Sequence, residues 1–112
     1  NNQVVTLNYA NFLQESGDYA KAELLLQDFL ILSPNNFIAH DLLTTVYRKQ
    51  QKMDLMHISK AEVYGLMGGY SQAIDELQSG YKYASEKPLI RKRIKARILQ
   101  MQEMEEKLKR LN

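Results

Sequence analysis

The side chains that could do chemistry are few, and their spacing argues against a catalytic centre. His40 and His57 are the two histidines. Neither stands in a His-Glu-x-x-His zinc helix. Two imidazoles without a carboxylate at ligand spacing make a poor metal site. Because they are 17 residues apart, on what we expect to be successive helices, we interpret them as structural or surface histidines.

Other catalytic patterns are missing as well. Neighbouring carboxylates on a helix point in different directions and do not converge on one substrate; this applies to Asp75-Glu76 and Glu105-Glu106. Gly68-Gly69 is too short to cradle a phosphate, and there is no Gly-x-Ser-x-Gly motif. The absence of cysteine excludes disulfides and thiolate zinc sites within the chain. The sequence therefore predicts no catalysis, no metal and no cofactor for this chain.

Composition is that of an ordinary folded domain, with 45% hydrophobic and 25% charged residues among 112. No apolar run approaches the ~20 residues of a membrane span, so we expect no membrane insertion. Charge is uneven, because residues 86–112 hold nine Lys/Arg and four Asp/Glu (9 − 4 = +5) while residues 1–85 carry six and nine (6 − 9 = −3). Without aromatic or Gly-rich partner motifs, this basic tail favours a solvated helix face and no nucleic-acid partner. The chain does not begin with Met, so we expect a fragment of a longer protein.

Apolar residues recur at steps of three and four, which predicts an all-α fold. The first helix is indicated by Val5, Tyr9, Phe12 and Leu13, and the third by Ile38, Leu42, Val46 and Tyr47. The seven tyrosines are interpreted as packing or turn residues, with Tyr9, Tyr47 and Tyr64 on core faces. Six helices are predicted, over residues 3–16, 19–32, 36–50, 53–67, 70–84 and 87–110.

The predicted helix ends have physical causes. Gly17 permits the left-handed conformation that ends a helix, and Asp18 is a candidate cap for the next one. Pro34 cannot continue a helix, and Asn36 is then a plausible N-cap. Pro88 is tolerated only in a first turn, so the last helix should begin near it.

Two spacings indicate an internal repeat. Asn1-Asn2 recurs 34 residues later as Asn35-Asn36, and Gly17-Asp18-Tyr19 recurs 51 residues later as Gly68-Gly69-Tyr70. Because 51 is one and a half times 34, the third hairpin is offset by half a repeat, and the helix at 53–67 should serve two hairpins. Small residues are expected where paired helices approach closely: Ala10, Ala22, Ala61, Ala73 and Gly80.

The motif Gly17-Asp18-Tyr19-x-x-Ala22, followed by Pro34-Asn35-Asn36, resembles the tetratricopeptide repeat, whose period is 34 residues. The resemblance implies an α-solenoid of about six antiparallel helices, forming three hairpins in a single domain over residues 1–112. Its repeats would span 3–36, 37–53 and 54–87, with a longer capping helix at 88–110. The apolar stripe of this last helix leaves two readings open, a cap with a polar outer face or a seam that docks a partner. The stripe contains Ile94, Ile98, Met101, Met104, Leu108 and Leu111.

In that family the first helix of each repeat lines a concave groove that holds a protein or peptide. The resemblance therefore predicts a partner groove formed by Asn8, Asn11, Asp41, Thr45, Arg48 and Glu62. The carboxylate clamp of chaperone-binding repeats is incomplete here. Asn11 fits one clamp place, but Leu7, Asp41 and Ile58 do not supply the rest. We therefore expect a partner other than a chaperone C-terminus.

A narrower resemblance lies in the second half of the chain. Lys60-Ala61-Glu62-x-Tyr64, Gly69-x-x-x-Ala73-Ile74 and Arg93-Ile94-x-Ala96-Arg97-Ile98 resemble the C-terminal repeat domain of the β-barrel assembly-enhancing proteases. These are periplasmic zinc metalloproteases whose catalytic domain precedes the repeats. The resemblance implies a periplasmic location, a parent enzyme that holds zinc elsewhere, and outer-membrane assembly machinery or its client proteins as partners. The alternative is a generic repeat scaffold of a secretion, pilus or cytoplasmic complex.

Overall fold

The computed structural model describes residues 2–112, and all of its regular structure is helical. The helices are α1 (Gln3–Glu15), α2 (Tyr19–Leu32), α3 (Phe37–Lys49), α4 (Met53–Leu66), α5 (Tyr70–Tyr83) and α6 (Pro88–Leu111). No strand occurs in these residues. The all-α prediction is confirmed, and every predicted helix end lies within one residue of the observed one.

Three of the interhelical turns share one backbone geometry. Gly17, Gln51 and Gly68 follow the C-caps of α1, α3 and α4, and all have positive φ, at 84°, 59° and 80°. In each turn two backbone N–H groups return to the last helical turn; for example, Gln51 N donates to Arg48 O and Lys52 N to Tyr47 O. This is the Schellman pattern, which satisfies carbonyls at a helix end. Glycine adopts such a φ freely, whereas Gln51 does so at a cost.

The turn geometry also decides which helices receive a side-chain cap. Asn36 is the N-cap of α3 as predicted: its backbone is extended (ψ 113°), and its Oδ1 accepts from Ala39 N at 2.9 Å. The prediction that Asp18 caps α2 is wrong, because its side chain makes no capping bond. Asp18 follows a left-handed residue and has ψ 66°, so its side chain is not placed as that of Asn36 is.

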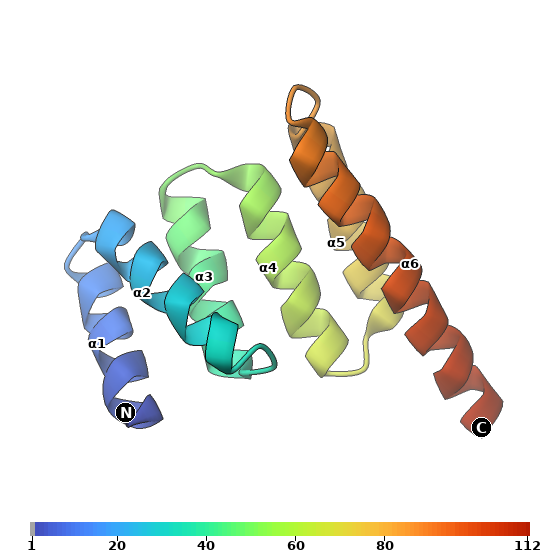
Figure 1. Cartoon of the computed structure of the whole chain (residues 1–112), viewed down its shortest axis with the longest axis horizontal. Helices are drawn as coiled ribbons and strands as arrows, with labels where there is room; N and C mark the ends of the chain where they lie inside the picture. Colours follow the sequence, from blue (N-terminus) through green and yellow to red (C-terminus); the bar gives the residue numbers. More distant parts are fainter. Residues whose placement is uncertain (1) are drawn as a thin grey trace.

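The helices form two three-helix units that repeat each other. In the first unit α1, α2 and α3 all contact one another, and in the second α4, α5 and α6 do the same. Adding 51 to the ends of α2, 19 and 32, gives 70 and 83, the ends of α5. The units are joined where α4 packs on α3 (Figure 1). The prediction that α4 serves two hairpins is therefore confirmed, since it contacts both α3 and α5.

Small residues lie where helices cross most closely. Ala10, Ala22, Ala61 and Ala73 have no exposed surface. At Gly80 an added Cβ would lie 3.1 Å from the Cβ of His57 and 3.2 Å from a backbone oxygen. The predicted role of these five positions in close packing is confirmed.

The predicted core face of α1 is wrong in part. Its buried residues are Leu7, Ala10 and Leu13. Val5 and Phe12 are each 61% exposed, and Tyr9 is 44% exposed. Helical spacing alone does not tell which of two apolar stripes is covered, and α1 packs only against α2 and α3. Ile38 at the start of α3 is exposed for the same kind of reason.

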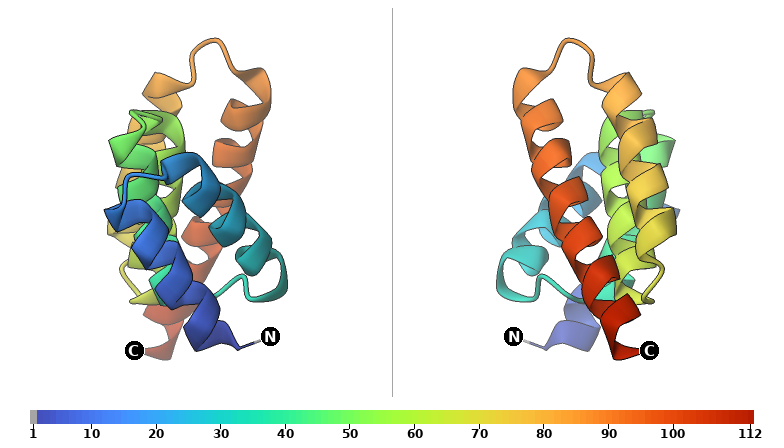
Figure 2. Two further views of the ribbon diagram at one scale, coloured as in Figure 1. Left: turned by 90° about the vertical axis from the view of Figure 1, so that its left-hand side faces the viewer. Right: turned by 90° about the vertical axis from the view of Figure 1, so that its right-hand side faces the viewer.

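The last helix is packed from its start to about Met104, and its C-terminal end is exposed. Ile94 and Met101 are buried, whereas Leu108 and Leu111 are exposed. The C-terminal part of α6 runs past the α4–α5 turn (Figure 1). Figure 2 shows that α2 and the first half of α6 lie on the same side of the α3–α4 pair. On that side α2 and α6 face each other across a space, and α3 and α4 form its floor.

Candidate partner groove

A groove runs between α2 and α6, and we call it the central groove. It consists of two adjoining hollows of about 290 Å³ and 430 Å³. They share Pro34, His40, Ile58, Glu62 and Arg93. The α2 side adds Gln27 and Leu30, the floor adds Leu43, Tyr47, Ser59 and Leu77, and the α6 side adds Ile94, Ala96, Arg97 and Gln100. The backbones of α2 and α4 do not approach each other closely within residues 2–112, which is why the space between these helices stays open.

The second unit supplies a fixed ion pair to the groove. Arg97 Nε and Nη2 donate to the two oxygens of Glu62, both at 2.8 Å. Arg97 Nη1 donates to Gln100 Oε1 at 2.7 Å. The hydrogen bonds to Glu62 raise the pKa of Arg97, against the opposing effect of burial. A bidentate pair of this kind fixes geometry as well as charge, so α6 is held over α4 in one orientation.

The first unit supplies a polar network behind the α2 wall. Gln27 Nε2 donates to the Tyr47 hydroxyl at 2.8 Å and to Glu23 at 3.1 Å, and Glu23 also accepts from Gln50 and Lys52, each at 2.8 Å. Burial on its own raises the pKa of Glu23, but the hydrogen bonds and the Lys52 charge outweigh it, so the pKa is lowered. The network ties α2 to α3 and to the α3–α4 turn.

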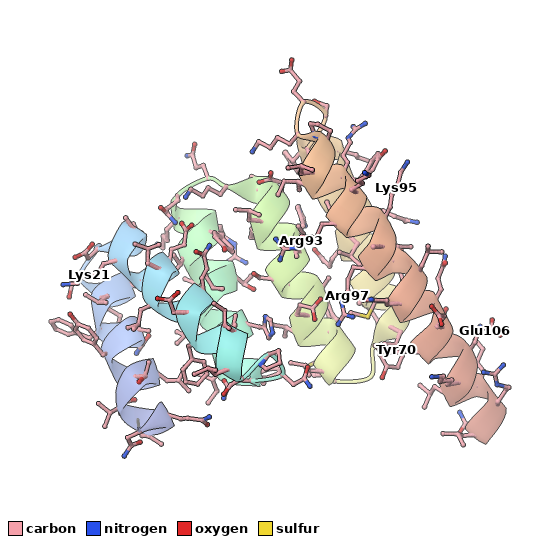
Figure 3. All side chains as sticks on the ribbon, viewed as in Figure 1. Lys21, Tyr70, Arg93, Lys95, Arg97 and Glu106 are labelled. Atoms are coloured by element: carbon pink, nitrogen blue, oxygen red, sulfur yellow. The ribbon has the colours of Figure 1, made fainter. Side chains whose placement is uncertain are left out.

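Two basic side chains, Arg93 and His40, line the groove without a carboxylate partner within the described residues. Arg93 is exposed on α6 and forms no ion pair within the described residues. Arg93 and Arg97 both reach from α6 over α4, whereas Lys95 points away from the groove (Figure 3). His40 Nε2 lies 2.7 Å from Pro34 O. A carbonyl oxygen only accepts, so this nitrogen carries the hydrogen.

The structure does not gather the six residues predicted from the sequence into one site. Glu62 lines the central groove, but its carboxylate is engaged by Arg97. The other five lie outside the groove walls. Asn8 and Asn11 are exposed on α1, Asp41 and Arg48 are exposed on α3, and Thr45 on α3 is half-buried.

The prediction missed the two walls of the groove, which come from α2 and α6. The prediction placed the site on the first helices of the repeats, whereas this groove uses a second helix (Gln27, Leu30) and the terminal helix (Arg93, Arg97). The basic run at 91–97 was visible in the sequence. Its position over α4 depends on the fold of the second unit.

The described residues contain neither a metal-ligating cluster nor a membrane-spanning helix. No cluster of three or more His, Cys, Asp or Glu side chains that could hold a metal occurs in residues 2–112. His57 Nδ1 donates to Glu76 at 2.8 Å, and its ring stacks on Tyr83 with centroids 5.6 Å apart, so this histidine has a packing role. None of the helices over these residues combines the length and the apolar character needed to cross a bilayer.

Comparison with known proteins adds no assignment, since no protein-family model and no curated protein matches the chain.

Proposed function

We propose that the chain is a protein-interaction module that holds an extended segment of a partner protein in the central groove. The observation that carries the proposal is the groove itself, an open channel with buried apolar side chains beneath polar walls. Binding sites are typically concave, largely apolar and marked by a few placed polar groups. The groove walls belong to both three-helix units, so the whole fold is needed to build them.

The proposal assigns no catalysis to this chain. The polar side chains of the groove are engaged in structural hydrogen bonds or lack the paired base and nucleophile that a reaction needs. A partner that adopts one conformation on binding loses chain entropy, so we expect modest affinity.

We further propose that the chain is the C-terminal repeat domain of a periplasmic zinc protease that acts in outer-membrane β-barrel assembly or quality control. The support is the sequence resemblance together with one structural relation. Glu62 comes from the first of the resembling segments and Arg97 from the third, and the two form the bidentate pair of the second unit. In this proposal zinc and proteolysis belong to the parent protein outside this chain. The alternative remains a generic repeat scaffold.

Site-specific photo-crosslinking tests the proposal. A benzoylphenylalanine at Ala96, which is exposed and lines the groove, is expected to capture a partner from a Gram-negative envelope preparation. The matched control is the same substitution at Gln102, which is exposed on the same helix and does not line the groove. An outer-membrane assembly component crosslinked only from Ala96 supports the protease assignment, and another specific protein supports the scaffold. Equal crosslinking from both positions would rule out the groove as the binding site.

A further inference from the structure

The polar groups on the groove walls are unevenly divided between donors and acceptors. The one carboxylate, Glu62, has both oxygens occupied by Arg97. The Gln100 amide oxygen also accepts from Arg97, and its amide nitrogen is left to donate. Apart from the amide oxygen of Gln27, the Ser59 hydroxyl and Nδ1 of His40, the side-chain acceptors in the groove are therefore occupied.

Donors, in contrast, remain available. Arg93 is exposed and has no ion pair within residues 2–112. Tyr47 accepts from Gln27 through its hydroxyl oxygen, which leaves the hydroxyl hydrogen free to donate. Burial raises the pKa of that hydroxyl, although the Gln27 hydrogen bond and the charge of Arg93 oppose the rise, so Tyr47 remains a donor at neutral pH.

The groove extends on both sides of Arg93. On one side it reaches Gln27 and Tyr47, and on the other it reaches Ala96 and Gln100. A third hollow shares Glu62 and Arg97 and continues along α4 to Tyr70 and Met104. From Ile58 to Leu66 the α4 helix rises about 12 Å, the length of roughly four extended residues. A chain can therefore pass through the groove, and the residue opposite Arg93 is an internal residue of the partner.

We propose that the central groove recognises an extended segment with an internal Asp or Glu, whose carboxylate pairs with Arg93 while apolar neighbours lie over Leu43 and Ile58. The inference rests on the proposed function and adds the chemistry of the partner. A carboxylate is the ligand group that a guanidinium and a phenol hydroxyl both match, since it offers only acceptors. The cation of Arg97 is already neutralised by Glu62, so the free positive charge of the groove is that of Arg93.

A display library of random peptides of about eight residues tests the inference, since such a peptide at ~3.3 Å per residue exceeds the length of the floor. The baits are the unaltered chain, Arg93→Glu and Lys95→Glu. The last makes the same charge change on the same helix at a side chain that points away from the groove (Figure 3). Circular dichroism and melting curves confirm that the three baits are equally folded.

The unaltered chain and Lys95→Glu are expected to select peptides with Asp or Glu at one fixed position between apolar residues. Arg93→Glu is expected to select Lys or Arg at that position. Changing the selected Glu to Gln in the best peptide should weaken its binding to the unaltered chain roughly three- to tenfold in fluorescence anisotropy. The same peptide change should have little effect on binding to the Arg93→Gln variant of the chain.

The outcomes distinguish the recognition of a carboxylate by Arg93 from the proposed binding of a partner in the central groove. If peptides that compete with one another are selected without any acidic preference, the groove binds partners and the carboxylate assignment is wrong. If Lys95→Glu changes the selection as much as Arg93→Glu does, the effect is one of overall charge and the inference is overturned. If no bait selects any peptide family, the inference and the proposed function both fail.

Discussion

The Schellman turns give a prediction whose size follows from backbone geometry. Gln51, Gly17 and Gly68 hold equivalent places, with φ of 59°, 84° and 80°. The Gln51 side chain is exposed and makes no hydrogen bond within the described residues. Replacing it with glycine therefore removes backbone strain and breaks no side-chain hydrogen bond. Gly17→Ala and Gly68→Ala make the opposite change, because an added Cβ meets nothing within 4 Å at either site.

The magnitudes can be worked out from the two opposing effects of glycine. A side chain at a left-handed position costs about 1–2 kcal/mol. Glycine also gives the unfolded chain extra conformational freedom, which lowers the free energy of unfolding by about 0.5–1 kcal/mol. Gln51→Gly is thus expected to raise the free energy of unfolding by about 0.5–1 kcal/mol. For 112 residues at ~2.1 cal/mol/K per residue, the melting temperature should rise by roughly 2–4 °C.

Urea titration and thermal melting followed by circular dichroism measure the series. Gly17→Ala and Gly68→Ala should each lower the free energy of unfolding by about 0.5–1 kcal/mol. Gln51→Ala is the control, since it keeps the strained φ and should change stability by less than about 0.5 kcal/mol. The reasoning is refuted if Gln51→Gly leaves the melting temperature unchanged, or if Gln51→Ala raises it as much as glycine does.

Three further predictions concern the network, the packing and the binding face. The lowered pKa of Glu23 means that its contribution to stability is complete above the unfolded value of 4.5 and is lost as the pH falls through the folded value. In urea titrations Glu23→Gln should therefore be less stable than the unaltered chain at neutral pH, with a difference that shrinks in acid; a constant difference contradicts the network. Ala73→Leu should lower the free energy of unfolding by about 1–3 kcal/mol through overpacking. Ala20→Leu, at an exposed position, should leave the melting temperature nearly unchanged. Equal melting temperatures for the two variants would refute the α4–α5 packing. Arg93→Glu should weaken partner binding in fluorescence anisotropy, whereas Arg48→Glu should not. If only Arg48→Glu weakens binding, the partner binds the surface predicted from the sequence and not the central groove.

Local features of the chain were predictable because their causes lie within a few residues. Gly17 and Gly68 end helices by their own conformational freedom, and Asn36 caps α3 with its own side chain. The 51-residue spacing of the two turn motifs predicted the offset of half a repeat, and the structure shows that this spacing relates two three-helix units. Ala22 and Ala73 follow those turns by a fixed step and are both fully buried.

The sequence by itself determined the six helices, their ends, the offset of half a repeat and the positions of the small residues, since each of these follows from short-range conformational preference or from a repeated motif. Only the tertiary structure decided which faces are used. Glu62 and Arg97 are 35 residues apart, and nothing in their own neighbourhoods shows that they pair. The same holds for Val5 and Phe12, which stay exposed although their spacing matches a core face. Pairing and burial depend on how whole helices are placed, and that placement is fixed by the packing of all six helices together.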